Sequence, residues 1–204
     1  MLDQVLIIAG ITVLIMVSPG PDMAIVTRNT ILGGRAAGFT TSLGVLTGNL
    51  VHIGYCVVGI GVLISQSLVA FSVLRYAGAA YLAYLGISSL LAGRAVENVA
   101  ASSQTVRARG WYVQGFVNNI LNPKGTLFYL GVFTIVITPD TGIGVTALLI
   151  LIMVSISASF WLAFVLTLDH ASVRRLLDRS RLAVNRVFGV LLIAIALRVA
   201  LFER

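Results

Sequence analysis

The sequence predicts an all-α integral membrane protein with about six transmembrane helices. Of its 204 residues, 58% are hydrophobic and 10% are charged, whereas a soluble domain carries roughly a quarter charged residues. The apolar residues gather in runs near or above the roughly 20 residues that a helix needs to cross the hydrocarbon core. Helices are required there because lipid offers the backbone no hydrogen-bond partner. We therefore expect residues 1–204 to form a single membrane domain.

Six apolar runs are the candidate transmembrane helices. The first is expected to be retained, because the N-terminus lacks the basic region of a signal peptide and Ser18-Pro19-Gly20-Pro21-Asp22 is not a small-residue cleavage site. Short connections between the runs favour a compact bundle. The runs cover residues 4–27, 36–64, 67–92, 111–138, 143–168 and 184–202.

The basic residues predict the orientation of these helices. The net charge is +7, but most arginines lie between runs one and two, three and four, or five and six, and the loops near 65 and 140 carry no basic residue. Cytoplasmic loops accumulate Lys and Arg, so both termini are expected outside. The same distribution argues against a nucleic-acid-binding face. These arginines are Arg28, Arg35, Arg94, Arg107, Arg109, Arg174, Arg175, Arg179, Arg181 and Arg186.

The chain divides near its middle into two similar halves. The longest polar segment, residues 93–110, is expected to be a cytoplasmic linker between a first repeat at 1–92 and a second at 111–204. Each half begins with a run that contains a proline followed by a charged residue, Asp22 in one half and Lys124 in the other. Three helices per half would insert the halves with opposite topology. Inverted repeats with interrupted helices indicate a secondary transporter.

The first interruption lies at Pro19, Gly20 and Pro21. Each proline removes a backbone donor and crowds the carbonyl four residues earlier, so run one must bend or unwind there. One interpretation is a proline kink with Asp22 at the cytoplasmic boundary. The other is that freed carbonyls and Asp22 form part of a substrate site, with Asp22 also a candidate proton carrier.

The second interruption carries the only lysine of the chain. The three amides Asn118, Asn119 and Asn122 precede Pro123 and Lys124 in an otherwise apolar run. Lys124 lies about 20 Å into this run. A lysine at that depth needs a carboxylate, carbonyls or water as partners. It either forms a structural ion pair with Asp22 or recognises a substrate carboxylate. A cation and an anion in equivalent places of two halves would complement the backbone of an amino acid.

Run two adds further polar residues. Asn49 and His52 are three residues apart and share one helical face, and we include Asn49 in the candidate site. For His52, hydrogen-bonded packing is favoured over a proton path. Gly44-x3-Gly48 is typical of a close helix contact.

Motifs for catalysis, metals and cofactors are missing from the sequence. There is no HExxH, Walker or GxGxxG motif, and the lone Cys56 can form neither a disulfide nor a redox pair within one chain. We therefore expect no enzyme activity, no metal and no cofactor, and coupling to an ion gradient, most simply of protons. The alternative is a passive channel or membrane scaffold in which Asp22 and Lys124 are only structural.

The motifs taken together resemble the LysE/RhtB family of amino-acid exporters. The residues that carry the resemblance are Ser18-Pro19-Gly20-Pro21-Asp22, Gly33-Gly34-Arg35-x2-Gly38, Gly44-x3-Gly48-Asn49 and Gly115-Phe116-x5-Asn122-Pro123-Lys124. The resemblance covers the whole chain and implies proton-driven export of amino acids or their derivatives across the bacterial inner membrane. The Pro-Gly-Pro-Asp form is more similar to the branch for neutral and homoserine-type substrates. The expected partners are an amino acid, protons and lipid, with a homo-oligomer left open.

Overall fold

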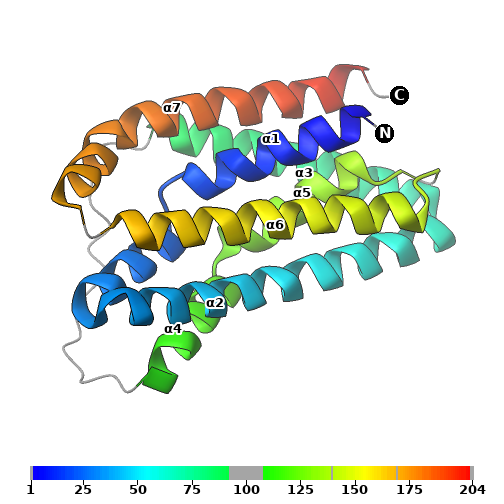
Figure 1. Ribbon diagram of the computed structural model, residues 1–204. Coiled ribbons are helices and arrows are strands. Elements are labelled where there is room, and N and C mark those ends of the chain that lie inside the picture. Colours follow the sequence, from blue (N-terminus) through cyan, green and yellow to red (C-terminus); the bar gives the residue numbers. More distant parts are fainter. Residues whose placement is uncertain (1, 92–107, 139, 169, 203–204) are drawn as a thin grey trace.

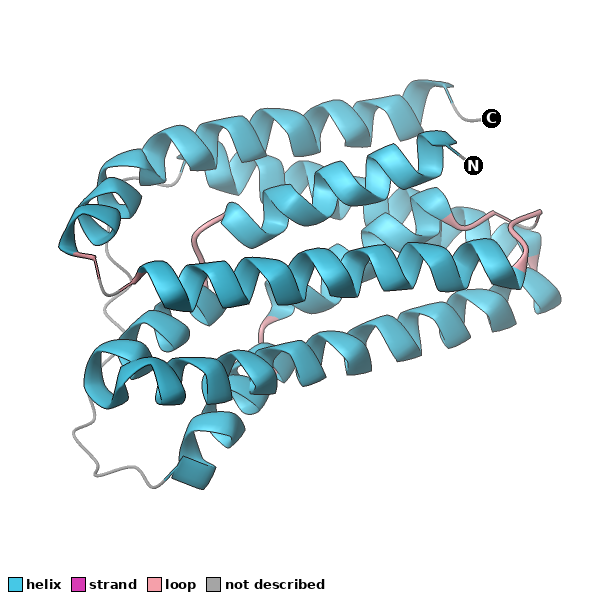
Figure 2. Ribbon diagram, viewed as in Figure 1, coloured by secondary structure: helices cyan, strands magenta, loops and turns pink. Residues whose placement is uncertain are grey.

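The regular structure of the chain is helical throughout the residues described. The computed structural model describes residues 2–91, 108–138, 140–168 and 170–202, and no strand occurs in them (Figure 2). The predicted all-α class is therefore confirmed. The helices are α1 (Leu2–Val17), α2 (Pro21–Gln66), α3 (Leu68–Leu91), α4 (Ala108–Ile120), α5 (Pro123–Val136), α6 (Ile143–Thr167) and α7 (Ala171–Phe202).

Four of the described helices, α2, α3, α6 and α7, are long and apolar enough to cross a membrane. Helices α1 and α5 are also apolar but have only 16 and 14 residues, which at 1.5 Å per residue gives about 24 and 21 Å. The hydrocarbon core is about 30 Å thick, so neither reaches across it alone. A multi-pass membrane protein is confirmed, while the count of six crossings stays a prediction.

Helix α2 is two helices joined at Gly34. Its backbone there has φ 72° and ψ −172°, a region that is open essentially to glycine alone. The kink separates residues 21–33 from residues 35–66. It lies between residue 27, where the first predicted run ends, and residue 36, where the second begins. The chain therefore turns back between the two runs.

The chain leaves helical structure at both proline motifs. Helix α1 ends at Val17 and α2 begins at Pro21, while α4 ends at Ile120 and α5 begins at Pro123. Proline is favoured in the first helical turn because its missing N–H would be unpaired there anyway. Each proline therefore begins a new helix where it cannot continue the previous one.

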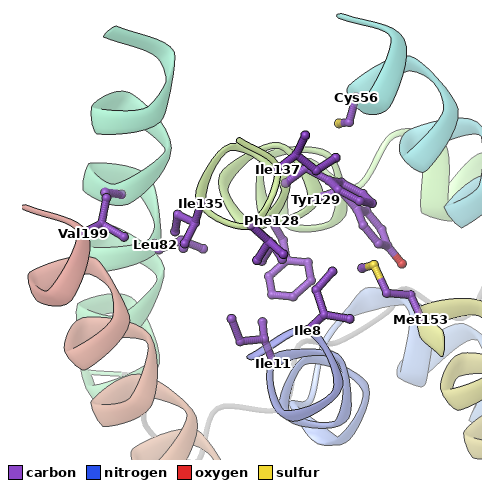
Figure 3. Packing of buried hydrophobic residues seen from close by; sticks show 14 of the residues in the cluster. Ile8, Ile11, Cys56, Leu82, Phe128, Tyr129, Ile135, Ile137, Met153 and Val199 are labelled. Carbon is purple, nitrogen blue, oxygen red and sulfur yellow. The ribbon is translucent and has the colours of Figure 1, made fainter. Parts of the chain in front are cut away.

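Helix α5 lies in the centre of the bundle. Figure 3 looks along it and shows side chains of other helices around it, among them Ile8 and Ile11 of α1, Leu82 of α3 and Met153 of α6. Phe128 of α5 is fully buried among them. The start of α1 and the end of α7 lie at the same end of the bundle (Figure 1), an arrangement that fits the predicted even number of crossings.

Helices α2 and α4 approach closely through glycines. A Cβ atom added at Gly44 would overlap the carbonyl of Tyr112, and one added at Gly115 would overlap the carbonyl of Thr41. Small residues let helix backbones come into contact. The predicted role of Gly44-x3-Gly48 as a helix contact is confirmed, and the contact brings α4 and its amide side chains against α2.

Two predicted boundaries differ from the structure. Helix α4 begins at Ala108, three residues before run four, and α7 begins at Ala171, thirteen residues before run six. The arginine-rich segment 174–186 is thus helical, because arginine and leucine are good helix formers once a helix has left the apolar core. The rest of the predicted linker, 93–107, lies outside the described residues.

Candidate functional site

The carboxylate of Asp22 is held by three asparagine side chains of the opposite half. Its Oδ1 accepts a hydrogen bond from Nδ2 of Asn118 at 2.7 Å, and its Oδ2 accepts from Nδ2 of Asn119 at 3.0 Å and of Asn122 at 3.2 Å. Hydrogen bonds to ionised groups are about twice as strong as neutral ones. Asp22 also lies in the first turn of α2, where the helix dipole favours a negative charge.

The spacing of the three asparagines explains how they reach one carboxylate. Asn118 and Asn122 are four residues apart and Asn119 and Asn122 are three apart, so they are neighbours on one helical surface. They surround the end of α4, where the last turn gives way to the break before Pro123. The second broken helix therefore supplies the donors for the charge of the first.

Asn119 extends this network to α2. Its Nδ2 donates both to Asp22 and, at 2.9 Å, to Oδ1 of Asn49. The same side chain lies against Gly48, where an added Cβ atom would overlap Oδ1 of Asn119. Gly48 is thus needed for Asn119 to approach α2 closely enough to bridge two residues of that helix.

The ammonium group of Lys124 lies at the other break. Its Nζ donates to Oγ of Ser18 at 2.8 Å and to the carbonyl of Pro19 at 3.2 Å. These groups follow the last residue of α1, where unpaired carbonyls and the helix dipole favour a cation. Nζ also lies 5.1 Å from the centre of the Phe188 ring on α7, within the range of a cation–π contact.

Each of the two charged residues binds groups at the break of the other half. Asp22 begins a helix in the first half and binds amides at the broken end of α4, whereas Lys124 begins a helix in the second half and binds oxygens after the broken end of α1. Each of these part-buried charges has hydrogen-bond partners, as intramembrane charges need. These reciprocal contacts also join the two halves at the level of the breaks.

His52 binds the backbone that the second break leaves open. Pro123 has no N–H to donate to the carbonyl of Asn119, four residues before it. That carbonyl instead accepts from Nε2 of His52 at 3.1 Å and from the backbone N–H of Asn122. Nε2 must therefore carry a hydrogen, and Nδ1 lies 2.6 Å from the hydroxyl oxygen of Tyr55, within hydrogen-bond distance. This arrangement agrees with the packing role favoured for His52.

Both charged residues line one cavity between α1, α2, α5 and α6. Its volume is about 40 Å³, enough for about three water molecules. In this conformation it is too small to enclose an amino acid, so loading it requires the surrounding helices to move apart. Its walls are Ile15, Met16, Ser18, Gly20, Asp22, Met23, Asn49, Asn122, Lys124, Gly125, Phe128, Tyr129 and Trp161.

A second buried polar cluster lies one to two helical turns from the cavity. Nδ2 of Asn29 donates to Oγ1 of Thr41 at 3.0 Å and to Oε1 of Gln114 at 3.1 Å. Gln114 is one turn before Asn118 on α4, and Asn29 is two turns after Asp22 on α2. Polar side chains thus continue from the cavity along the α2–α4 contact.

The structure brings the sequence-predicted site residues together around the cavity and the two breaks. Pro21 and Pro123 begin α2 and α5, and the carbonyl of Pro19 accepts from Lys124. Within the described residues, no group of three or more His, Cys, Asp or Glu side chains could hold a metal ion. The predicted set was Pro19, Gly20, Pro21, Asp22, Asn49, Asn118, Asn122, Pro123 and Lys124.

Sequence reasoning left out three residues of this region. Asn119 is one of the three amides of the second interruption but was not in the predicted set, and the structure shows Asn118 and Asn119 reaching the two oxygens of one carboxylate. Ser18 lay inside the quoted motif, which was a usable signal. Trp161 lies in a run whose nearby serines, Ser157 and Ser159, do not single it out, so only the packing of α6 reveals it.

Comparison with known proteins gives one family and several relatives. The model of the family described as LysE type translocator matches residues 13–202. The chain is 27% identical to the leucine efflux protein of Salmonella typhimurium, over 94% of this chain and 92% of that protein. It is also 27% identical to the membrane proteins YrhP of Bacillus subtilis and YahN of Escherichia coli, over 94% and 97% of this chain and 95% and 89% of theirs. No solved structure matches the chain.

Proposed function

Since the chain belongs to the LysE type translocator family, we propose that it is a proton-coupled secondary exporter of amino acids or small amino-acid derivatives in the bacterial inner membrane. The observation that carries the proposal is the single cavity lined by both Asp22 and Lys124 at two broken helices. Buried charges are costly in a membrane and mark substrate or ion pathways. Interrupted helices supply binding groups at membrane depth in secondary transporters.

The charges of the cavity complement a zwitterion. An amino acid carries an ammonium group, which Asp22 attracts, and a carboxylate, which Lys124 attracts. Both residues are held in place by the opposite half of the chain, so their positions change if the halves move. Substrate binding and movement of the halves are thereby linked.

The cavity walls favour a neutral substrate, of the aliphatic or of the homoserine and threonine type. Apart from the two charges and a few polar groups, the lining is apolar, with Ile15, Met16 and Phe128 among its residues. A basic side chain would need a second carboxylate, and Asp22 is the one acidic residue among those that line the cavity. The relatives named as leucine efflux proteins support the same substrate class.

Alternating access would follow from two inverted repeats of three helices. Helices α1 and 21–33 of α2 would together make the first crossing, and α4 with α5 the fourth, which gives six crossings in all. The positive-inside pattern places both termini outside. A cavity of about 40 Å³ supports a carrier, which opens to each side in turn, in preference to an open channel.

Export from loaded cells tests the proposal. Cells that express the wild-type protein, Asp22→Asn or Lys124→Met are loaded with leucine, threonine or homoserine, and internal and external amino acids are quantified before and after the proton gradient is dissipated. We expect gradient-dependent export by the wild type and its loss in both variants at equal protein amounts in the membrane.

Two other outcomes would contradict the proposal. Downhill flux that ignores the proton gradient would identify a passive channel. Absence of flux for every amino acid, with the protein folded in the membrane, would favour a scaffold in which the two charges are structural. Proteoliposomes with an imposed pH gradient separate these outcomes from effects of cell metabolism.

A further inference from the structure

Two residues of the cavity wall each carry a buried hydrogen-bond donor that has no partner among the described residues. The donors are Nδ2 of Asn49 on α2 and Nε1 of Trp161 on α6. The side chains are 5% and 3% exposed. Buried polar groups are hydrogen-bonded in the great majority of cases, so each exception calls for an explanation. Both exceptions line the one cavity that also contains Asp22 and Lys124.

The network fixes which end of the Asn49 amide is unpartnered. Nδ2 of Asn119 donates to the carboxylate of Asp22, so the group of Asn119 that faces Asn49 is a donor. The atom of Asn49 that it meets must therefore be the oxygen. The NH₂ group of Asn49 is left for a different acceptor, and turning the amide over would break the bond to Asn119.

Trp161 lies on α6 among aromatic and aliphatic side chains. Its ring makes edge contacts with Phe160 and Phe164, with centroids 5.3 and 5.7 Å apart, and it belongs to the buried cluster with Ile25 and Val26. An indole N–H can only donate. Its position on α6 adds a group from a helix that supplies neither charged residue.

We propose that the Asn49 amide and the Trp161 indole bind the carboxylate of the exported amino acid. This inference rests on the proposed function and names the groups that recognise one end of its substrate. Both free groups are donors, so they fit a negatively charged acceptor and cannot bind an ammonium group, which Asp22 attracts. Lys124 lines the same cavity and adds a positive charge that attracts a carboxylate.

The chain provides a matched pair of tryptophan variants for the test. It contains two tryptophans, and Trp111 lies beside Gly33, away from the cavity. Trp161→Phe removes the indole N–H and keeps an aromatic ring, and Trp111→Phe is the control. Binding of L-leucine, and of 3-methylbutylamine, which is leucine without its carboxylate, is measured on purified full-length protein in lipid nanodiscs.

The carboxylate should be the group that the substitution affects. We expect Trp161→Phe to weaken leucine binding about 10-fold or more, as for the loss of a hydrogen bond to a charged group, and to leave amine binding unchanged. Trp111→Phe should bind both compounds as the wild type does, and its remaining tryptophan fluorescence should respond to leucine and not to the amine. Equal weakening for both compounds, or no change for leucine, would overturn the assignment.

Asn49→Asp is the second variant. It keeps an oxygen for Asn119 and replaces the free NH₂ by a second oxygen, so leucine binding should fall at least as far as in Trp161→Phe. Unchanged leucine binding would remove Asn49 from the site.

The test distinguishes this inference from the proposed function. If the wild type exports leucine and Trp161→Phe binds it normally, only the carboxylate assignment fails. If no amino acid binds the wild type, 4-methylpentanoate, which has a carboxylate and no ammonium group, is tested next. If 4-methylpentanoate binds the wild type and not Trp161→Phe, the carboxylate assignment stands although the proposed export function fails. If it does not bind the wild type either, the assignment and the proposed function are both overturned.

Discussion

The two interrupted helices look alike in sequence, but the groups that hydrogen-bond to their broken ends differ. The break between α4 and α5 spans two residues and carries its own cap, because Oδ1 of Asn122 accepts from the backbone N–H of Lys124 at 3.1 Å. The break between α1 and α2 spans residues 18–20, and its described side-chain contacts come from Lys124 across the bundle. The second break thus has a cap of its own besides its contacts with Asp22 and His52, whereas the described side-chain contacts of the first break come from the second half of the chain.

This difference indicates which contacts are able to change during a transport cycle. A local cap such as that of Asn122 moves with its helix, so α5 keeps its N-terminus when the halves rearrange. The bonds of Lys124 to Ser18 and Pro19 join the two halves and must change if the halves separate. We therefore expect substitutions around the first break to affect transport, and those in the local cap to affect stability.

The largest effect is expected from Asp22→Asn. The substitution removes the charge that three asparagines bind. The NH₂ group of the new amide also cannot accept a hydrogen bond in place of the second carboxylate oxygen. Export should fall about 100-fold or more, because each hydrogen bond to a charged group contributes about 1.5–3 kcal/mol. Transport per molecule in proteoliposomes measures the loss. Asp140→Asn, at an exposed acidic residue, should export normally, and equal losses in the two variants would contradict a specific role for Asp22.

Lys124→Met should come next, and it tests the first break directly. It removes the ammonium group that binds Ser18 and Pro19, so the end of α1 loses its cation, at a cost of about 2–3 kcal/mol. Hydrogen exchange measured by mass spectrometry should rise around residues 14–20 more than around 118–124. Arg186→Met, at an exposed cation of α7, is the control. Equal exchange at both breaks would show that the first break does not depend on Lys124.

A smaller effect is expected from Gly44→Ala, which separates α2 from α4 without touching either charge. The added Cβ atom would overlap the carbonyl of Tyr112, so overpacking should destabilise the protein by about 1–3 kcal/mol. Gly54→Ala in the same helix meets nothing within 4 Å and should be neutral or slightly stabilising. Thermal unfolding in detergent compares the two. A Gly44→Ala protein as stable as Gly54→Ala would mean that the two helices are not in close contact.

The smallest effect concerns His52, which binds from α2 a single backbone carbonyl at the second break. His52→Gln keeps a donor for the carbonyl of Asn119, whereas His52→Leu leaves that carbonyl without the bond. We expect His52→Leu to be less stable than His52→Gln by about 1 kcal/mol, and His52→Gln to retain proton-coupled export. Loss of proton coupling in a stable His52→Gln protein would place the histidine in a proton path.

Much of the fold follows from short-range properties of the sequence. Apolar runs gave the helical class, and Pro21 and Pro123 marked where helices begin, because proline acts on its own backbone. The N-terminal part of α7 was not predicted, because hydropathy marks the apolar membrane segment and not the whole helix. The helix also includes Arg175 and Arg179. A turn between residues 27 and 36 was expected, but its place at Gly34 was not predicted, because a glycine pair does not show which residue of it will turn.

The sequence alone determined the membrane class, the two breaks and the charges beside them, because composition and proline geometry act through lipid and local backbone. The tertiary structure decided the partners of those charges. Asp22 is bound by asparagines about a hundred residues away, and Lys124 binds Ser18 and Pro19. Such pairings depend on how closely α2 and α4 pack, and that distance is set by glycines whose contacts lie on another helix. Trp161 joins the cavity for the same reason, since α6 brings its indole to a wall that no local pattern marks.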